Sequence, residues 1–468
     1  MSENVKNPVK DDVAFYVDVK KRMPLVVVIM ISLIGSTMFG YGLATAMMSI
    51  GESVNGLALV AWLFTASNIV QMVLNPLIPA LDAKFGLPKL VLIGMILQVV
   101  VLGVFSFAAN MPLMIAMRAV SGIAGGILFT GGLALAGQIV TPEKRATVTG
   151  LQMVFNGVGS MAGPLLAGLA CDMGNWRIWT LIALVPSVVA LIFYIVFYPK
   201  NTRSAETKAA KFDLPGVLII AVLFVALALL LQMSGNYWSW ISPVTFILVA
   251  VVVVSIIIFV KVEVSVEKKG NRPAFRVTLF KQRAFLVPAI CALIVCIGTN
   301  GIATYSPAYA QTVLGLSATQ SSLGYSIGSI FVIILSLLNG VVFGKKRWFK
   351  PCNTIGCGIG IIVAIVLISS GHMSAGLFTF LIAFYATFTA WISSVNFTVA
   401  QMLLPTDDVV DATAGVVSTQ MIGAFLGVSL NTAIINSLGY SGLFGTVIVS
   451  FAAGILIMLC LKDTGKAK

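Results

Sequence analysis

The shortage that says most about this sequence is a shortage of charge. Charged residues make up 10% of the 468 residues and hydrophobic residues 59%, with a mean hydropathy of +1.03. Soluble globular domains carry about 25% charged residues. The composition therefore excludes a soluble globular domain and indicates a chain that lies largely in a lipid bilayer.

Residues that carry enzymatic or nucleotide chemistry are also scarce. His372 is the only histidine, and the sequence offers no paired nucleophile and base, so we expect no enzyme. It has no Walker A motif, and the glycine run at 356–360 lies inside an apolar stretch, where it favours helix packing over phosphate binding. The six cysteines form no CxxC pair that would suggest zinc. We expect no cofactor and no metal, and a gradient as the driving force.

Long apolar runs, by contrast, are abundant. A membrane-spanning helix needs roughly 20 mostly apolar residues. The pattern predicts an all-α integral membrane protein with 14 transmembrane helices. They begin near Met23, Leu57, Leu90, Pro112, Met153, Ile178, Leu214, Pro243, Leu286, Ser321, Asn353, Ala375, Ala412 and Gly442.

The basic residues predict the topology. Of the 29 lysines and arginines, all but Arg118 and Arg177 fall in the two tails or in alternate loops. Positive charge beside a span is retained in the cytoplasm, so we expect both termini to be cytoplasmic in a multi-pass protein of the cell (plasma) membrane. The net charge of +13 then reflects topology, and we expect no nucleic-acid partner.

Polar stretches divide the chain into five parts. We expect a cytoplasmic tail (1–22), a six-helix half (23–199), a linker with two inserted helices (200–282), a second six-helix half (283–462) and a cytoplasmic tail (463–468). Paired halves are typical of secondary transporters, which rock around a site near the midplane. We expect a monomer in the lipid bilayer that carries a small organic substrate, and we assign no role to the inserted helices.

The fifth span carries the most specific motif. It reads NGVGSMAGPLLAG at 156–168, with Asn-Trp-Arg at 175–177. Small residues let this helix approach a neighbour closely, and Pro164 removes a backbone donor and permits a bend. A merely kinked packing helix is the alternative. We expect Gly159, Gly163, Pro164 and Gly168 to serve the conformational change.

This motif resembles the antiporter signature of the major facilitator superfamily, and the whole chain resembles the fourteen-helix drug:proton antiporter branch of that family. A second match is RAVSGIAGG at 118–126 in span four, which is similar to the family's pattern of an arginine before a glycine-rich face. Arg118 would lie roughly 9 Å below the outer end of its span. Because an embedded charge is costly, we expect a functional role for it; snorkelling to the headgroups is the alternative.

A third stretch departs from the family pattern. The loop between spans two and three reads PALDAKFGLPK at 79–89. Aligned on Gly86, its acid Asp82 stands one position early, and Leu87 replaces a basic residue. We expect Asp82, Lys84, Gly86 and Lys89 to form a weakened or rebuilt version of the contacts that close the cytoplasmic side.

The resemblance implies an acid inside the membrane that exchanges a proton for substrate, but the 16 acids fall in tails, loops or helix ends. Either Asp82, Asp172 or Asp411 takes over near an interface, or another ion is coupled. The expected cavity lining is neutral and aromatic, which suits bulky amphipathic molecules. It consists of Arg118 with Asn68, Gln71, Gln152, Asn156, Asn300, Tyr305, Tyr325, Tyr385 and Trp391.

The sequence therefore predicts a transporter that exports amphipathic or lipophilic organic compounds in exchange for protons by alternating access. A carrier that imports or exchanges organic anions (carboxylates) by means of Arg118 stays open as the alternative. A receptor or scaffold without flux is a third class, which saturable transport would exclude.

Overall fold

The structure is a computed structural model of the chain. It describes residues 19–75, 78–139, 145–198, 214–234, 237–268, 277–346, 349–369, 373–403 and 409–461. Within these ranges the secondary structure is helical, apart from an isolated bridge between Ser234 and Trp238. Most of both expected tails, and His372, lie outside the described residues.

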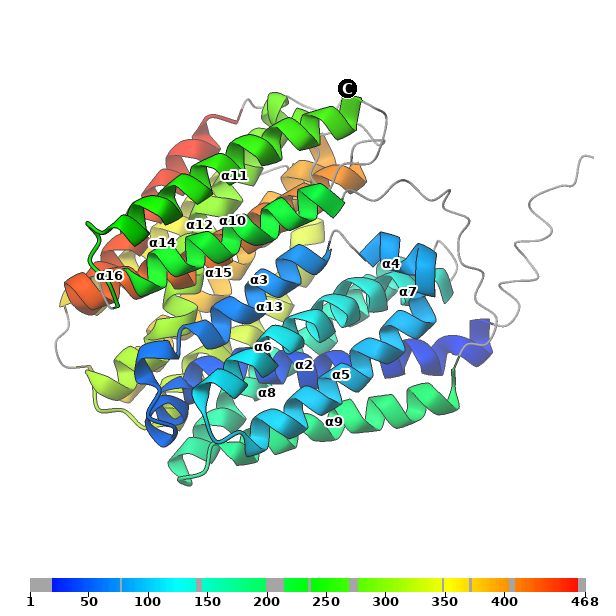
Figure 1. Cartoon of the computed structure of the whole chain (residues 1–468), viewed down its shortest axis with the longest axis horizontal. Coiled ribbons are helices and arrows are strands. Elements are labelled where there is room, and N and C mark those ends of the chain that lie inside the picture. The colour runs from blue at the N-terminus through cyan, green and yellow to red at the C-terminus, as the bar shows by residue number, and fades with distance from the viewer. Residues whose placement is uncertain are drawn as a thin grey trace, which may run out of the picture.

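The first half contains long helices joined by short turns (Figure 1). Its elements are α2 (Val19–Ser53), η1 (Leu57–Leu59), α3 (Trp62–Leu74), α4 (Ile78–Phe85), α5 (Leu87–Phe107), α6 (Met111–Gly126), η3 (Ile127–Gly131), α7 (Gly132–Ile139), α8 (Arg145–Asp172) and α9 (Arg177–Val196).

The inserted helices are α10 (Leu214–Met233) and α11 (Pro243–Lys268). The second half consists of η5 (Val277–Lys281), α12 (Arg283–Thr312), α13 (Ala318–Lys346), α14 (Phe349–Ser369), α15 (Ala375–Leu403) and α16 (Val409–Leu459). Gly439 interrupts α16 with a φ of 69° and a ψ of −166°, so α16 consists of two helical segments.

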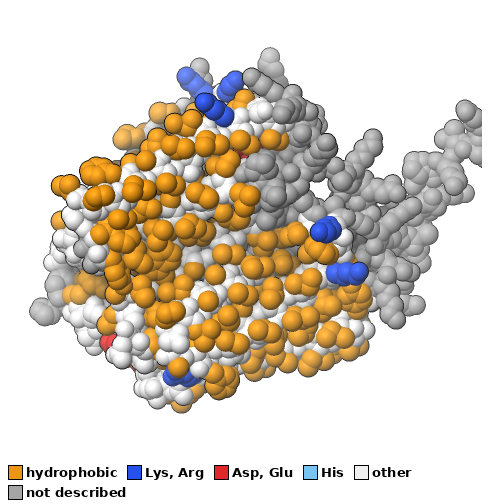
Figure 2. Space-filling view, viewed as in Figure 1, with side chains coloured by type: hydrophobic (Ala, Val, Ile, Leu, Met, Phe, Trp, Pro, Cys, Tyr) orange, Lys and Arg blue, Asp and Glu red, His pale blue; other side chains and the backbone are white. Residues whose placement is uncertain are grey.

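Eleven spans among the described residues are long and apolar enough to cross a membrane. The apolar part of α10 that qualifies is the shorter stretch Leu218–Met233, and Gly415–Leu459 forms one span of 45 residues. The outward surface matches these spans, because hydrophobic side chains cover the described part of the face in Figure 2 and the blue lysines and arginines lie at its edges. Only 11% of the α11 span is buried, as expected for a helix that faces lipid.

Glycines set the closest helix packing of the first half. A Cβ added at Gly163 on α8 would lie 2.6 Å from the carbonyl oxygen of Met38 on α2, and one at Gly42 would lie 2.7 Å from the carbonyl oxygen of Gly163. Side chains at either position would separate the two helices. The small residues of the motif at 156–168 therefore fold α8 tightly against α2.

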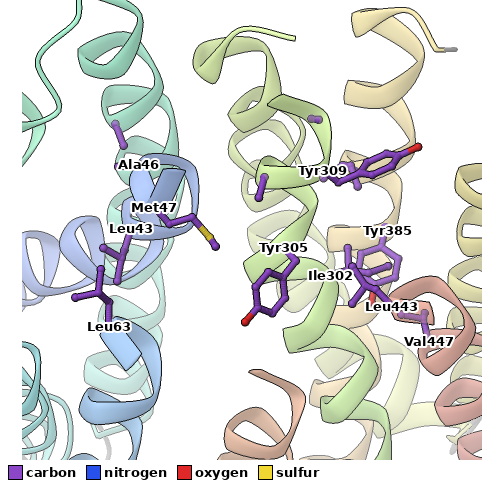
Figure 3. Close-up of a cluster of buried hydrophobic side chains, with 14 of the residues drawn as sticks. Leu43, Ala46, Met47, Leu63, Ile302, Tyr305, Tyr309, Tyr385, Leu443 and Val447 are labelled. Atoms are coloured by element: carbon purple, nitrogen blue, oxygen red, sulfur yellow. The ribbon is translucent and has the colours of Figure 1, made fainter. Parts of the chain in front are cut away.

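The largest core cluster has members in both halves. Figure 3 shows Leu43, Ala46 and Met47 of α2 beside Leu63 of α3, and across from them the residues of the second half. On that side Ile302 and Tyr309 of α12 lie near Tyr385 of α15 and near Leu443 and Val447 of α16, while the ring of Tyr305 points toward the first half. Tyr309 makes edge contacts with the rings of Tyr440 and Phe444. These aromatic groups fix α12 against α16.

The inserted helix α10 lies beside both α3 and α16 (Figure 1). Phe224 of α10 packs edge-on against Phe425 of α16, with ring centroids 5.3 Å apart, and the same buried cluster contains Ile69 of α3. The side-chain amide of Gln232, 4% exposed, donates hydrogen bonds to Thr65 of α3 and to Ser429 of α16. Thus α10 connects the first half to the second.

Candidate functional site

The two halves enclose a cavity of about 360 Å³. The first half contributes side chains from α2, α3, α5, α6, η3 and α8, and the second half contributes them from α12, α13 and α16. Aromatic rings line it at Phe39, Tyr41, Phe64, Phe129 and Tyr325. Its size and its mixture of rings with polar groups are those of a small-molecule site.

The structure brings six of the sequence-predicted substrate residues into this lining. They are Arg118, Asn68, Gln71, Asn156, Asn300 and Tyr325. The cavity therefore joins amides of both halves around one guanidinium. Pro164 of the motif on α8 also lines it.

Four other predicted residues stand outside the lining. Gln152 donates a 3.0 Å hydrogen bond to the carbonyl of Phe129, in the π-helical turn η3. A π-turn disturbs the regular backbone hydrogen bonding of a helix. The side chain of Gln152 therefore supplies a hydrogen bond to a carbonyl of this irregular turn. Tyr305 shares a hydrogen bond with Thr432, Tyr385 donates to the carbonyl of Gly298, and Trp391 packs against Phe388.

Arg118 is the one charged residue in the lining formed by the described residues. It is 6% exposed, and its Nε donates a 2.7 Å hydrogen bond to the carbonyl of Leu63, while Nη1 donates to Ser121 at 3.2 Å. Its guanidinium carbon lies 4.8 Å from the ring centroid of Phe39. Carbonyl, hydroxyl and ring thus hold the guanidinium in the cavity wall, where snorkelling is not needed to place it.

One end of the bundle joins the two halves directly, and we call it the Asp172 end. The carboxylate of Asp172, the last residue of α8, accepts hydrogen bonds from the backbone amides of Ala318 (2.8 Å) and Thr319 (3.0 Å) at the start of α13. Nearby, a Cβ added at Gly168 would lie 2.6 Å from the Cα of Thr319. Gln311 of α12 donates to the carbonyl of Thr45 on α2 at 3.1 Å. The halves are therefore in contact across the Asp172 end.

Asp82 lies just before the start of α5, at the end of the bundle opposite to the Asp172 end. The helix α5 between the two ends is about 30 Å long. Its carboxylate accepts a 2.9 Å hydrogen bond from the amide of Leu87, and Gly86 between them has a φ of 79° that favours glycine. Burial raises the pKa of the Asp82 carboxyl, while the hydrogen bond from Leu87 lowers it. Lys84 and Lys89 are exposed beside it. These residues shape the turn into α5.

Two findings go beyond the sequence analysis. Gln98 of α5 is 1% exposed and lines the cavity. The only sequence signal for this role is that Gln98 is an isolated amide in a strongly apolar helix. Glu263 lies five residues before the last residue of α11, near a helix end as expected, but its side chain is fully buried. It is not part of the cavity lining.

The chain matches the family model "Major Facilitator Superfamily" over residues 25–233 and 216–419. It is 26% identical over 353 residues to the multidrug transporter protein MdtP of Bacillus subtilis, which covers 75% of this chain and 62% of that protein. It is 24% identical over 285 residues to the probable multidrug resistance protein EmrY of Escherichia coli, which covers 61% and 54%. The chain therefore spans less than two thirds of the length of these relatives.

The fold agrees with these matches. The crystal structure of the peptide transporter POT superposes with a TM-score of 0.64 at 16% identity and covers 93% of each chain, which shows a shared fold. The expectation of a transporter in place of an enzyme is confirmed by the family match. The chain belongs to the major facilitator superfamily of transporters.

Proposed function

We propose that this protein exports amphipathic or lipophilic organic compounds in exchange for protons, by alternating access to the cavity between its halves. The observation that carries the proposal is the cavity itself, in which amides, rings and one guanidinium of both halves surround a space for a small organic molecule. The names of MdtP and EmrY support efflux of drugs over uptake of anions. Arg118, Asn68, Gln71, Asn156, Asn300 and Tyr325 are the proposed substrate contacts.

The proposal includes the finer topology. Fourteen crossings result if α10, α13 and the two segments of α16 each cross the bilayer. Both termini are then cytoplasmic, since the basic loops are retained there, and the Asp172 end is external. In this orientation the cavity is closed to the outside by the contacts of Asp172 and Gln311.

We place the coupling group outside the described cavity lining, because that lining holds no carboxylate. Backbone amides stabilise the ionised form of Asp172, which makes it a poor proton carrier. The side chain of Asp411 lies outside the described residues. The carboxylate of Asp82, at the turn into α5, accepts one backbone amide where Asp172 accepts two, and burial raises its pKa, so we propose that Asp82 exchanges the proton.

Efflux from cells tests the proposal. Cells that express the protein are loaded with Nile red, a neutral amphipathic dye, and its export is followed with and without a protonophore. We expect saturable export that the protonophore stops and that Asp82→Asn slows at least about tenfold, because the amide cannot exchange a proton. Glu52→Gln, which changes an exposed acid at the other end of the bundle, serves as the control. Export that persists unchanged in Asp82→Asn would remove Asp82 from the coupling step.

A further inference from the structure

The cavity wall contains an unexplained amide. The side-chain oxygen and nitrogen of Gln98 are both buried, and neither has a hydrogen-bond partner among the described residues. The hydroxyl of Thr45 in the same lining is also without one. Buried polar groups in native proteins are nearly always paired with protein, water or ligand. A glutamine in an apolar helix whose two polar atoms stay unpaired therefore calls for a partner that is absent from the chain itself.

The helix around Gln98 offers no packing reason for an amide. Its neighbours in sequence along α5 are aliphatic, and leucine or methionine would fill a similar volume without a polar group to satisfy. The other buried polar residue of α5, Ser106, is paired with Thr180 at 2.6 Å and with the carbonyl of Leu102. Gln98 differs from Ser106 in lining the cavity. The cavity is thus the place from which a partner would come.

Other hydrogen-bond donors line the same cavity as Gln98. Ser36, Gln71 and Asn156 come from three other helices of the first half and face the same cavity. A Cβ added at Gly125 would lie 3.6 Å from Nε2 of Gln71 and 3.7 Å from Oγ of Ser36, so the amide and the hydroxyl both lie beside this glycine. No carboxylate of the described residues opposes them.

Arg118 adds a positive charge to the same cavity lining. Its Nε and Nη1 are used by Leu63 and Ser121, and Nη2 donates to none of the described residues. With no acid in the described lining, the guanidinium is not neutralised by a partner. A cationic substrate in this cavity is repelled, whereas an acidic oxygen is attracted and can accept hydrogen bonds.

We propose that Gln98 and Arg118 form two parts of a binding subsite for the acidic oxygens of the substrate. The cavity then selects aromatic amphiphiles that carry a carboxylate or phenolate over lipophilic cations of the same size, with the rings of Phe39, Phe64 and Phe129 around the aromatic body. This inference rests on the proposed efflux function, whose substrate class it specifies. It adds Gln98, which the sequence motifs do not single out.

A matched pair of dyes tests the proposal by binding, independently of transport. Fluorescein and rhodamine 123 share a xanthene scaffold but carry opposite charge. Their affinities for the purified protein in detergent are measured by dye anisotropy. We expect fluorescein to bind at least about tenfold more tightly, since the sign of its interaction with Arg118 is favourable. Equal affinities, or tighter binding of rhodamine, would overturn the proposal.

Variants then locate the subsite. Gln98→Leu should weaken fluorescein about tenfold and leave rhodamine unchanged, and Gln98→Glu should reverse the preference by adding a negative charge. Ser106→Ala, on the same helix but away from the cavity, should change neither dye. If the Gln98→Leu variant fails to fold, Gln98→Met is measured in its place. Unchanged fluorescein affinity in the variant used would show that the amide binds only water, and would overturn the assignment.

The outcomes separate this inference from the proposed function. If Nile red is exported but the two dyes bind equally, the efflux proposal stands and the substrate class is wrong. If fluorescein binds through Gln98 but no compound is exported, the subsite stands as a ligand site and the efflux proposal fails.

Discussion

The carboxylate of Asp172 holds the backbone amide of Ala318 at 2.8 Å and so connects the end of α8 to the start of α13, across the boundary between the halves. The same carboxylate reaches the amide of Thr319 with its second oxygen. An acid placed at a helix N-terminus both accepts hydrogen bonds and complements the helix dipole. This contact closes the Asp172 end, which we propose to be external.

Asp172→Asn should shift the protein toward the state open at the Asp172 end. The amide keeps one acceptor but loses the charge, which is worth about 1 kcal/mol at a helix N-terminus and therefore roughly a fivefold change in the conformational equilibrium. Distances between spin labels at Met173→Cys and Val313→Cys, in a background without the native cysteines, measure the opening. We expect a larger population at long distance, whereas Glu52→Gln should leave the distribution unchanged. An identical distribution in Asp172→Asn would show that the contact does not hold the end closed.

Gly163→Ala should lower the thermal stability of the protein in detergent. The new Cβ would meet the backbone oxygen of Met38 at 2.6 Å, and backbone atoms move only at a cost, so overpacking should destabilise by about 1–3 kcal/mol. Gly358→Ala is the matched control, because nothing lies within 4 Å of its added Cβ. That variant should unfold at the same temperature as the original protein or slightly above it. Equal effects of the two alanines would contradict the packing explanation of the motif.

Gln232→Leu should uncouple the inserted helix α10 from the two halves. A double-mutant cycle with Ser429→Ala, read by unfolding in detergent, should give a coupling energy of about 0.5–1.5 kcal/mol, the range of hydrogen bonds between membrane helices. The same cycle with Ser450→Ala, whose hydroxyl bonds to its own helix, should give none. Zero coupling with Ser429 would mean that this hydrogen bond contributes nothing to holding α10 against the second half.

Arg118→Ala should abolish transport while the protein still folds. The substitution removes two hydrogen bonds and the contact with Phe39, but it leaves no buried acid unpaired, because no described acid contacts Arg118. Nile red export should fall at least about tenfold, and thermal unfolding should change little. Arg177→Ala, which removes an arginine outside the cavity lining, should keep its export. Full export by Arg118→Ala would reduce the arginine to a structural role.

Much of the architecture follows from local patterns. Apolar length predicts the helices, and the small residues at 156–168 predict tight packing of α8, which Gly163 and Met38 confirm. Arg118 stood out because a charge in an apolar run is costly. Composition alone does not fix the helix count, since Gly439 separates two helical segments within one apolar run of 45 residues.

Side-chain partners could not be predicted in the same way. Tyr385 and Gln152 are of the residue types expected in a cavity lining. Their side chains instead donate hydrogen bonds to the carbonyls of Gly298 and Phe129 on neighbouring helices. Gln98 is a single amide in an aliphatic helix, and periodicity does not say whether it faces a helix, lipid or the cavity. The bridging role of Gln232 depends on the packing of three helices that are distant in sequence.

The central claim is proton-coupled export through this cavity, and substrate-driven proton movement in proteoliposomes tests it most directly. Vesicles that contain the protein and an enclosed pH dye are exposed to Nile red under an imposed pH gradient. We predict that protons move opposite to the dye, that the movement saturates, and that Arg118→Ala removes it. Saturable Nile red flux with no proton movement would contradict proton exchange, and no Nile red flux above that of protein-free vesicles would contradict export of neutral amphiphiles through this cavity.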